Sequence, residues 1–204
     1  VIIVRGAGGK FSRGHDLAYE VELRLDAKAD VASHYEVTTM LPLRPGRYEL
    51  RFAAERLGSA GSVFVSLEVP NFREDRLSMS GLFLDKEPAR QRVVGQSIAR
   101  LVPFVPTTER RFRASDAVRV FAGVYQGLNT RIAPVTMTTD IRDSTDRATF
   151  TDTAVLGADR FANNMAEHQL NLPVSALVPG EYLLSVRATL DQRSVQRTIR
   201  FAVD

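Results

Sequence analysis

Hydrophobic and polar residues alternate with a period of two along most of this chain, which predicts β-strands with one buried face. The segment 17–26 shows this clearly, because every second residue from Leu17 to Leu25 is apolar and most residues between them are charged. The same alternation recurs in the segments 48–54, 63–69, 118–124, 135–141, 170–174, 182–188 and 199–203. Many short strands separated by turn residues favour an antiparallel β-sandwich fold.

One segment shows a helical spacing instead. Between Glu87 and Ala99, Val93, Val94 and Ile98 fall on one helical face, although Gly95 weakens the pattern. The segment 87–99 is therefore the one helical candidate in a chain that we predict to be all-β.

An internal repeat divides the chain into two copies of one unit. The segment 43–54 aligns without gaps on the segment 177–188, at an offset of 134 residues (177 minus 43). The next strand keeps this offset, so that Val65, Leu67 and Val69 align with Ile199, Phe201 and Val203. We predict two tandem immunoglobulin-like or fibronectin type III-like sandwiches, at 1–70 and 78–204, joined by a linker at 71–77.

Each copy carries the pattern Leu-x-Pro-Gly-x-Tyr before its penultimate strand, which places Tyr48 and Tyr182 at equivalent positions. In immunoglobulin-like sandwiches, a tyrosine at this corner buries its ring and returns its hydroxyl to nearby backbone. The Pro-Gly pair supplies the turn that precedes it. We therefore predict that Tyr48 and Tyr182 are structural tyrosine corners and bind no ligand.

The repeat offset also indicates that the first sandwich is incomplete at its N-terminus. Subtracting 134 from position 135 gives position 1, so the strands near 78–84, 101–105 and 117–125 have no counterparts in the first copy. We expect an unpaired edge or an exposed apolar face there. The first residues, Val1–Arg5, also lack the features of a secretory signal, so we expect a fragment or a processed piece.

Composition excludes several classes of protein. The 204 residues are 44% hydrophobic and 25% charged, which is typical of a globular protein. No apolar run is long enough for a membrane-spanning helix, and the chain contains no cysteine. The net charge of +3 is small and spread along the sequence, so we expect no nucleic-acid partner.

The patterns that resemble catalytic or phosphate-binding motifs are incomplete. The histidines, His15, His34 and His168, lack a second ligand at the spacing of a zinc site. The segment Gly6–Lys10 resembles a phosphate-binding loop, but Val4 and Phe11 occupy the positions of its first glycine and its magnesium-binding hydroxyl. The sequence also lacks a Gly-x-Ser-x-Gly nucleophile elbow. We assign no catalytic, cofactor-binding or metal-binding residue, although a Ser-His-Asp set assembled only in three dimensions remains open.

Two further groups of polar residues have simple structural explanations. Asp140, Asp143 and Asp146 form the densest acidic cluster, but their spacing does not match a calcium-binding EF-hand loop. A hairpin turn at 143–146 explains them, and calcium binding there is left open. The basic run Arg110–Arg113 lacks interleaved aromatic residues and indicates a charged surface.

Several segments resemble the region that follows the von Willebrand factor A-type domain in a group of bacterial proteins, abundant in acidobacteria. They are 43–52, 61–72, 77–84, 102–127 and 177–188. The resemblance implies an exported protein with an upstream von Willebrand factor A-type domain and a protein or cell-surface partner. The metal-ion-dependent adhesion site of the family belongs to that upstream domain. Its Asp-x-Ser-x-Ser pattern is absent here, so no metal ligand is carried over.

We therefore expect a non-catalytic module of two sandwiches that acts as a stalk or binds a protein. The alternative is a carbohydrate-binding sandwich, for which Phe64, Phe121 and Tyr125 would form the aromatic platform. The absence of tryptophan weighs against this alternative. A hydrolase with an unrecognised site is a third hypothesis, with no residue pattern in its favour.

Overall fold

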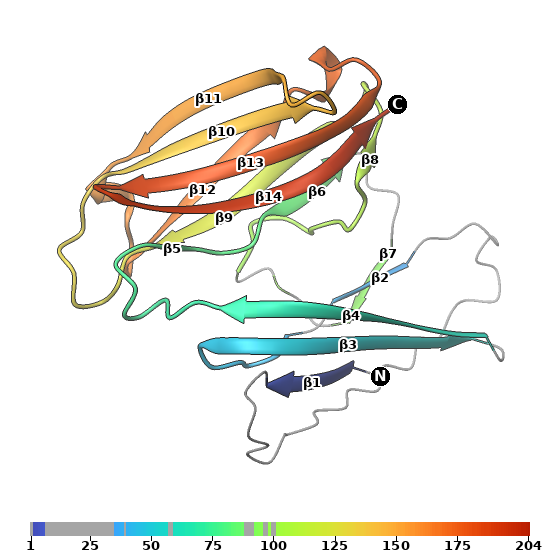
Figure 1. Cartoon of the computed structure of the whole chain (residues 1–204), viewed down its shortest axis with the longest axis horizontal. Helices are drawn as coiled ribbons and strands as arrows, with labels where there is room; N and C mark the ends of the chain where they lie inside the picture. Colours follow the sequence, from blue (N-terminus) through green and yellow to red (C-terminus); the bar gives the residue numbers. More distant parts are fainter. Residues whose placement is uncertain are drawn as a thin grey trace. The chain divides into compact units, whose positions relative to one another are not determined.

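A computed structural model describes residues 2–6, 35–38, 40–56, 59–87, 92–95, 98 and 101–204. Apart from two short 3-10 helices, the regular elements of the described chain are β-strands in mostly antiparallel sheets, so the all-β prediction is confirmed (Figure 1). The described residues fall into two compact units. Unit 1 contains residues 2–6 and 40–71, and unit 2 contains residues 35–38 and those from Phe72 onward.

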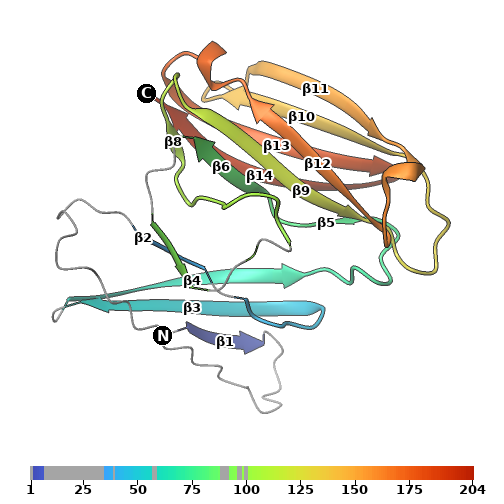
Figure 2. The same cartoon turned by 180° about the vertical axis from the view of Figure 1, so that it is seen from behind.

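Unit 2 consists mainly of two sheets that lie face to face, as the opposite views in Figures 1 and 2 show. One sheet has five strands in the order β11-β10-β13-β14-β8, and the other has the order β12-β9-β5 with β6 also paired to β9. The strands of the first sheet are β8 (Arg111–Phe112), β10 (Val135–Asp143), β11 (Ala148–Leu156), β13 (Gly180–Leu190) and β14 (Arg193–Val203). Those of the second are β5 (Ser78–Met79), β6 (Phe83–Glu87), β9 (Ala117–Tyr125) and β12 (Met165–Leu172).

The core of unit 2 lies between these sheets and is built from the alternate residues of their strands. Its members include Met79, Leu84, Val118, Val120, Ala122, Val124, Val135, Met137, Ile141, Leu184, Val186, Phe201 and Val203. The short helices η1 (Ala158–Arg160) and η2 (Val174–Ala176) flank β12 in the sequence, and Val174 of η2 joins the core. The two-residue periodicity therefore predicted which face of these strands is buried.

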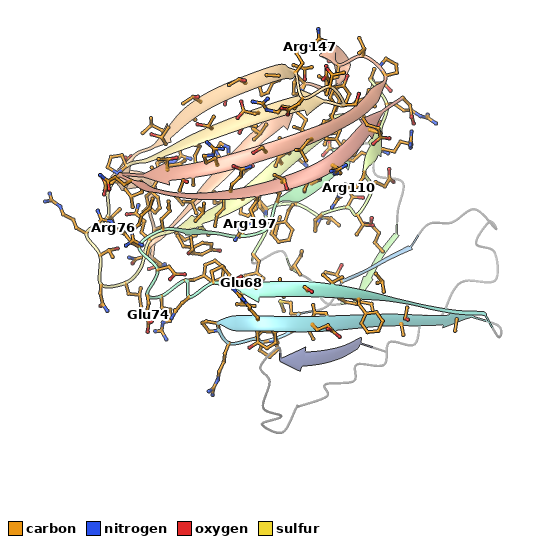
Figure 3. All side chains as sticks on the ribbon, viewed as in Figure 1. Glu68, Glu74, Arg76, Arg110, Arg147 and Arg197 are labelled. Carbon is orange, nitrogen blue, oxygen red and sulfur yellow. The ribbon has the colours of Figure 1, made fainter. Side chains whose placement is uncertain are left out.

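Two arginine side chains, labelled in Figure 3, connect separate segments at the surface of unit 2. Arg197 on β14 donates to the backbone oxygens of Met79, at 2.8 Å, and Ser80, at 3.1 Å. It thereby joins β14 of one sheet to β5 of the other. Arg76 forms an ion pair of 2.5 Å with Asp191 in the turn between β13 and β14.

Unit 1 contains one three-stranded antiparallel sheet in the order β1-β3-β4. Its strands are β1 (Ile2–Gly6), β3 (Gly46–Arg56) and β4 (Ser59–Val69). Leu50 is buried in a small apolar cluster with Leu41, Leu43, Tyr48 and Phe52. In the described part of unit 1, this cluster takes the place of the large core of unit 2.

The sequence repeat corresponds to one hairpin present twice. Gly46 pairs with Val69 and Tyr48 with Leu67 in the β3–β4 hairpin. Their counterparts at the repeat offset pair in the same way in the β13–β14 hairpin, where Gly180 faces Val203 and Tyr182 faces Phe201. A further antiparallel strand lies on the other side of each hairpin, β1 beside β3 and β10 beside β13, but the register there differs. Phe52 faces Ile2, whereas Val186, the counterpart of Phe52, faces Thr139 and not Thr136, the counterpart of Ile2.

The helical candidate at 87–99 is strand where the structure describes that segment. Residues Arg92–Gly95 form strand β7, which pairs in parallel with β2 (Tyr35–Thr38). Adjacent β-branched residues, Val93 and Val94, favour a strand. The pairing with β2 is a long-range contact, which a local helical pattern does not reveal.

Residues 72–77, assigned above to the linker, are attached to unit 2. The ring of Phe72 lies 4.6 Å from that of Tyr125, and Leu77 is buried in the core of unit 2. Gly127 is needed here, because a Cβ atom at this position would lie 2.9 Å from the backbone oxygen of Glu74. The predictions for 17–26, His15, His34 and most of the loop at 6–10 concern positions outside the described residues.

Candidate functional site

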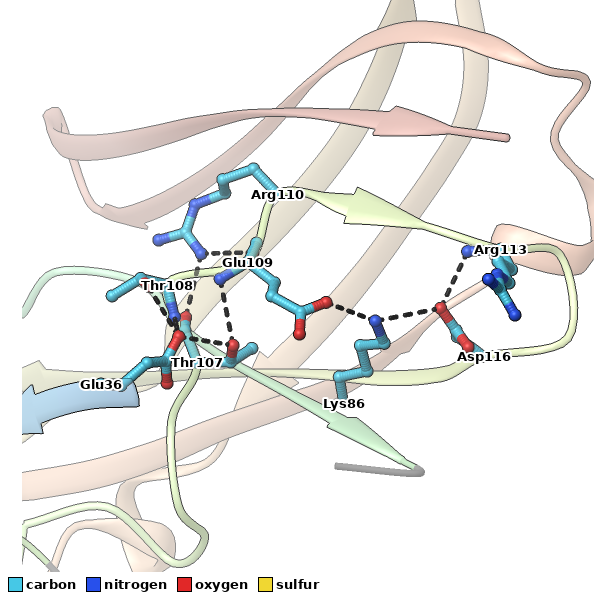
Figure 4. A network of polar contacts seen from close by, with 8 residues as sticks. All are labelled: Glu36, Lys86, Thr107, Thr108, Glu109, Arg110, Arg113 and Asp116. Atoms are coloured by element: carbon cyan, nitrogen blue, oxygen red, sulfur yellow. Dashed lines mark hydrogen bonds and ion pairs between the residues drawn. The ribbon is translucent and has the colours of Figure 1, made fainter. Parts of the chain in front are cut away.

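A network of polar contacts, several of them buried, lies in unit 2 (Figure 4). We call it the polar network. It comprises Glu36, Lys86, Thr107, Thr108, Glu109, Arg110, Arg113 and Asp116. These residues come from β2, from β6, from the segment that leads into β8, and from the turn before β9.

Lys86 is the cation at one end of the polar network. It follows Leu84 at the two-residue period of β6, so its side chain leaves the strand on the core side. Its Nζ forms an ion pair with Glu109 and lies 3.5 Å from Oδ2 of Asp116. The side chains of Lys86 and Asp116 are only 4% and 2% exposed, so this charge is neutralised inside the protein.

Asp116 is held by the turn from which it projects. Its Oδ2 accepts a hydrogen bond of 2.8 Å from the backbone N–H of Arg113, and its own N–H donates to the carbonyl of Arg113 at 2.9 Å. Aspartate favours such turns because its side chain can bond nearby backbone. The turn therefore positions the carboxylate toward Lys86 before β9 begins.

Glu36 is the buried anion at the other end of the polar network. Its Oε1 accepts three hydrogen bonds: from Oγ1 of Thr107 (3.0 Å), from the N–H of Thr108 (2.5 Å) and from Oγ1 of Thr108 (2.6 Å). Its Oε2 is buried and has no hydrogen-bond partner in the structure. Since Glu36 lies on β2, these bonds attach β2 to the segment at 107–108.

Arg110 is the nearby cation. Its guanidinium donates to the carbonyl oxygens of Thr107, at 3.0 Å, and Glu109, at 2.7 Å. Burial lowers the pKa of Arg110, and the negative charge of Glu36 partly opposes this effect. An arginine remains charged despite such a shift, so Arg110 supplies a fixed positive charge beside Glu36.

This arrangement suits cross-linking of strands better than chemistry on a bound molecule. Lys86 is enclosed by two carboxylates, and Oε1 of Glu36 is occupied by three donors. The described residues contain no group of three or more His, Cys, Asp or Glu side chains able to hold a metal ion. The polar network therefore connects β2 and β6 to the segments that precede β8 and β9, with Glu36, Lys86 and Asp116 as its buried charges.

The two corner tyrosines have the same geometry in both units. The hydroxyl of Tyr182 donates to the carbonyl of Val178 at 2.6 Å, and that of Tyr48 donates to the carbonyl of Arg44 at 2.8 Å. Each acceptor lies four residues upstream of its tyrosine. Tyr182 is buried and stacks on Phe201, with ring centroids 5.5 Å apart, whereas Tyr48 is partly exposed.

The aromatic residues considered as a sugar platform do not share an open surface. Phe121 points away from the core between the sheets, but it is only 2% exposed, because Phe83 and Phe104 pack against it. Phe121 therefore offers no ring face to a sugar, which corrects its place in that platform. Tyr125 is partly buried and contacts Phe72, while Phe64 belongs to unit 1.

Asp143 belongs to the hairpin turn between β10 and β11, as predicted. Its Oδ1 accepts bonds from the N–H and hydroxyl of Thr145, at 2.9 and 2.6 Å, and from the N–H of Arg147 at 3.1 Å. These bonds stabilise the carboxylate and lower the pKa of Asp143 to about 2, with the hydroxyl of Thr145 as the largest contributor. Asp140 instead accepts a bond from the hydroxyl of Thr151 on the neighbouring strand.

His168 lies on the core-facing side of β12 and is buried. Its Nε2 has no hydrogen-bond partner in the structure, so no serine hydroxyl is paired with that nitrogen. Burial lowers the pKa of His168, and the negative charge of Asp152 partly offsets this effect. We therefore expect His168 to be neutral near pH 7.

The run Arg110–Arg113 does not form one basic face. Arg110 belongs to the polar network, whereas Arg111 is 66% exposed and pairs with Asp204 at 2.7 Å and Glu181 at 3.8 Å. The hydrogen bond that Arg111 donates to the carboxylate of Asp204 raises the pKa of Arg111 above its usual value. The carboxylates neutralise much of the positive charge that the sequence shows here.

Sequence reasoning missed the residues of the polar network other than its arginines. The sequence did contain one signal at Lys86. Leu82, Leu84 and Lys86 occupy every second position, so the lysine lies on the side of the strand where apolar residues are expected. A charge at such a position needs a buried partner. Its partners, Glu109 and Asp116, lie in distant segments of the chain, and Glu109 is 23 residues from Lys86. Sequence spacing could therefore not identify them.

No family model and no curated protein sequence matches this chain. Among the described residues, no helix combines the length and hydrophobicity that crossing a bilayer requires. The functional argument therefore rests on the geometry of the chain itself.

Proposed function

We propose that this chain is a non-catalytic structural or interaction module, built as a tandem of immunoglobulin-like or fibronectin type III-like sandwiches. The strand order of unit 2 and its tyrosine at the entry to β13 support this comparison. In this proposal the module belongs to an exported bacterial protein with an upstream von Willebrand factor A-type domain. It acts there as a stalk or as a surface for a protein partner.

The observation that carries the proposal is the hairpin repeated in one register with the same tyrosine contact. The shared positions are those that build the fold: the apolar face, the Pro-Gly turn and the tyrosine. The outward positions differ, since Glu49 and Arg51 correspond to Leu183 and Ser185. A duplicated chemical site would need shared polar residues, whereas a duplicated spacer needs only a shared scaffold.

The polar network supports a role as a stalk, because a stalk must keep its strands together under mechanical force. The charged side chains of Glu36, Lys86 and Asp116 are buried, and their contacts with residues of neighbouring segments strengthen the connection between those segments. A chemical site would be expected to leave at least one reactive group open to a substrate.

The proposal is tested by assaying the purified chain with chromogenic esters and glycosides, together with the His168→Asn variant as a matched control. We expect hydrolysis at the buffer rate in both samples. Turnover above that rate which His168→Asn abolishes would contradict a non-catalytic role. In a parallel NMR titration with soluble polysaccharides, we expect no shift changes, and saturable changes would favour the carbohydrate-binding alternative.

A further inference from the structure

Lys86 is the only lysine in the part of the chain that the structure describes, since Lys10 and Lys28 lie outside that part. Ion pairs such as those of Arg76 and Arg111 use arginine instead. An arginine stays protonated and offers more donors to a carboxylate, whereas a lysine can lose a proton and become a nucleophile. The lysine at position 86 therefore adds a reactivity that a permanent ion pair does not need.

The amine of Lys86 is held between two carboxyl groups inside unit 2 (Figure 4). Its Nζ forms an ion pair with Glu109 and lies 3.5 Å from Oδ2 of Asp116, an atom that is bonded to the carboxyl carbon Cγ. The side chains of Lys86 and Asp116 are almost completely buried, and so is Val118, which faces Lys86 across the pairing of β6 with β9. The amine and the carboxyl carbon are thus kept close together where little water can enter.

Backbone contacts give the two carboxyl groups different roles. Oδ2 of Asp116 accepts a hydrogen bond of 2.8 Å from the N–H of Arg113. Such a donor stabilises the negative charge that develops on this oxygen when a nucleophile adds to Cγ. Glu109 is oriented by its own N–H, which donates to Oγ1 of Thr107 at 3.0 Å, and its side chain is 22% exposed. Asp116 is therefore suited to be attacked, and Glu109 to carry protons.

We propose that Lys86 and Asp116 condense to an amide bond, with Glu109 as the proton carrier. Glu109 takes a proton from Nζ, and the neutral amine attacks Cγ of Asp116. The Nζ–Cγ bond forms, and the bond from Cγ to Oδ1 breaks. This oxygen leaves as water with two of the three ammonium protons, both passed on by Glu109, which ends as the carboxylate it was. The third proton stays on the amide nitrogen.

Two physical effects favour this condensation without an activating co-reactant. Holding the reacting groups in place raises their effective concentration, to about 10⁵–10⁸ M in well-oriented intramolecular reactions. Burying an ammonium group and a carboxylate costs free energy of solvation, and the amide removes both charges together. The reaction occurs once in each chain and has no external substrate. It therefore goes beyond the proposed function and does not depend on it.

The bond would fasten β6 covalently to the turn before β9. It closes a loop of 30 residues (116 minus 86), which contains β7, β8 and the segment at 107–108 that binds Glu36. A cross-link of this kind restricts the unfolded chain, as a disulfide does, in a protein that has no cysteine.

Mass spectrometry of the purified 204-residue chain tests the proposal. Under denaturing conditions, we expect a mass below that of the sequence by one water, about 18 Da. Trypsin cleaves after arginine and unmodified lysine, so the cross-link should yield residues 77–90 joined to residues 114–119, without cleavage after Lys86. Fragmentation of this product should place the bond between Lys86 and Asp116.

Three variants separate the roles of the residues, with circular dichroism as a check on folding. Lys86→Arg keeps a cation but has no amine, and Glu109→Gln keeps the shape of the proton carrier but not its basicity, so both should retain the full mass. The matched control is Glu87→Gln, which removes a carboxylate next to Lys86 that is 67% exposed. It should lose one water as the parent chain does.

Four results would overturn the proposal. The first is a full-mass parent chain that trypsin cleaves completely after Lys86, a result that needs no variant to fold. The second is a loss of water that persists in Lys86→Arg, because the water would then come from another site. The third is a linked product that contains residues 101–110 in place of 114–119, because Glu109 would then be the acceptor. The last is complete cross-linking in Glu109→Gln, which would leave Glu109 without a role.

Discussion

Replacing Lys86 with methionine should destabilise unit 2 strongly. The substitution removes the ammonium group but keeps an unbranched side chain of similar length, so it leaves little cavity. Asp116, which is 2% exposed, then retains only the N–H of Arg113 as a hydrogen-bond donor. The dominant cost is therefore a buried carboxylate without its cation.

The expected magnitude follows from burial. Removing one partner of a buried ion pair costs about 3–5 kcal/mol, and the partly exposed Glu109 can turn toward water, which favours the lower limit of about 3 kcal/mol. For a protein of this size, that loss lowers the midpoint of thermal unfolding by about 6–12 °C. Changing Asp116 to asparagine in the same chain should recover part of the loss, because no buried charge then remains unpaired there.

The assay is urea unfolding followed by circular dichroism, since the chain has no tryptophan. Arg111→Met is the matched control, because it removes a cation whose side chain is 66% exposed and which also pairs with two carboxylates. An exposed pair contributes about 0–1 kcal/mol, so this variant should remain close to the parent protein. If Lys86→Met loses no more stability than Arg111→Met, the account of the buried polar network is refuted.

Three further predictions concern individual side chains. Tyr182→Phe should cost about 1 kcal/mol in urea unfolding, and Tyr48→Phe only a few tenths, because the hydroxyl of Tyr48 bonds in an exposed site; equal losses would contradict this. Because burial lowers the pKa of His168 below 6.5 in the folded state, stability should fall as the pH drops below about 6.5, by at most about 1.4 kcal/mol per pH unit from this group. The His168→Asn variant should show a shallower slope in unfolding at pH 7.5, 6.5 and 5.5, and an identical slope would exclude this origin. The carboxyl carbon of Asp143 should titrate near pH 2 by NMR, so its contribution is present above about pH 4 and is lost as the pH falls through about 2; a midpoint near 4 would disprove its turn contacts in solution.

The repeated architecture could be predicted because its signals are local. The Pro-Gly turn, the tyrosine and the two-residue alternation are all contained in about a dozen residues, and they predicted the strands that became β3 and β13. The repeat offset then aligned β4 with β14, and the structure pairs both hairpins in one register.

Contacts between distant segments account for the failures. The alternation in β9 shows only that Phe121 lies on the side facing away from the core between the sheets. It does not show that Phe104, from another segment, packs over Phe121 and buries it. The strand at 92–95 depends on its partner at 35–38. One partner of Lys86 lies in the segment before β8 and the other follows the turn before β9, so no spacing rule connects them to Lys86.

The most direct test of the account is an NMR measurement of nuclear Overhauser contacts across both hairpins of the intact 22.6 kDa chain. The account predicts that Tyr48 lies opposite Leu67 and that Tyr182 lies opposite Phe201, with both tyrosine hydroxyl protons protected by their backbone acceptors. A slip of one residue in either hairpin would contradict it. Such a slip would move the apolar side chains of that hairpin to the other face and remove the basis for two copies of one sandwich unit.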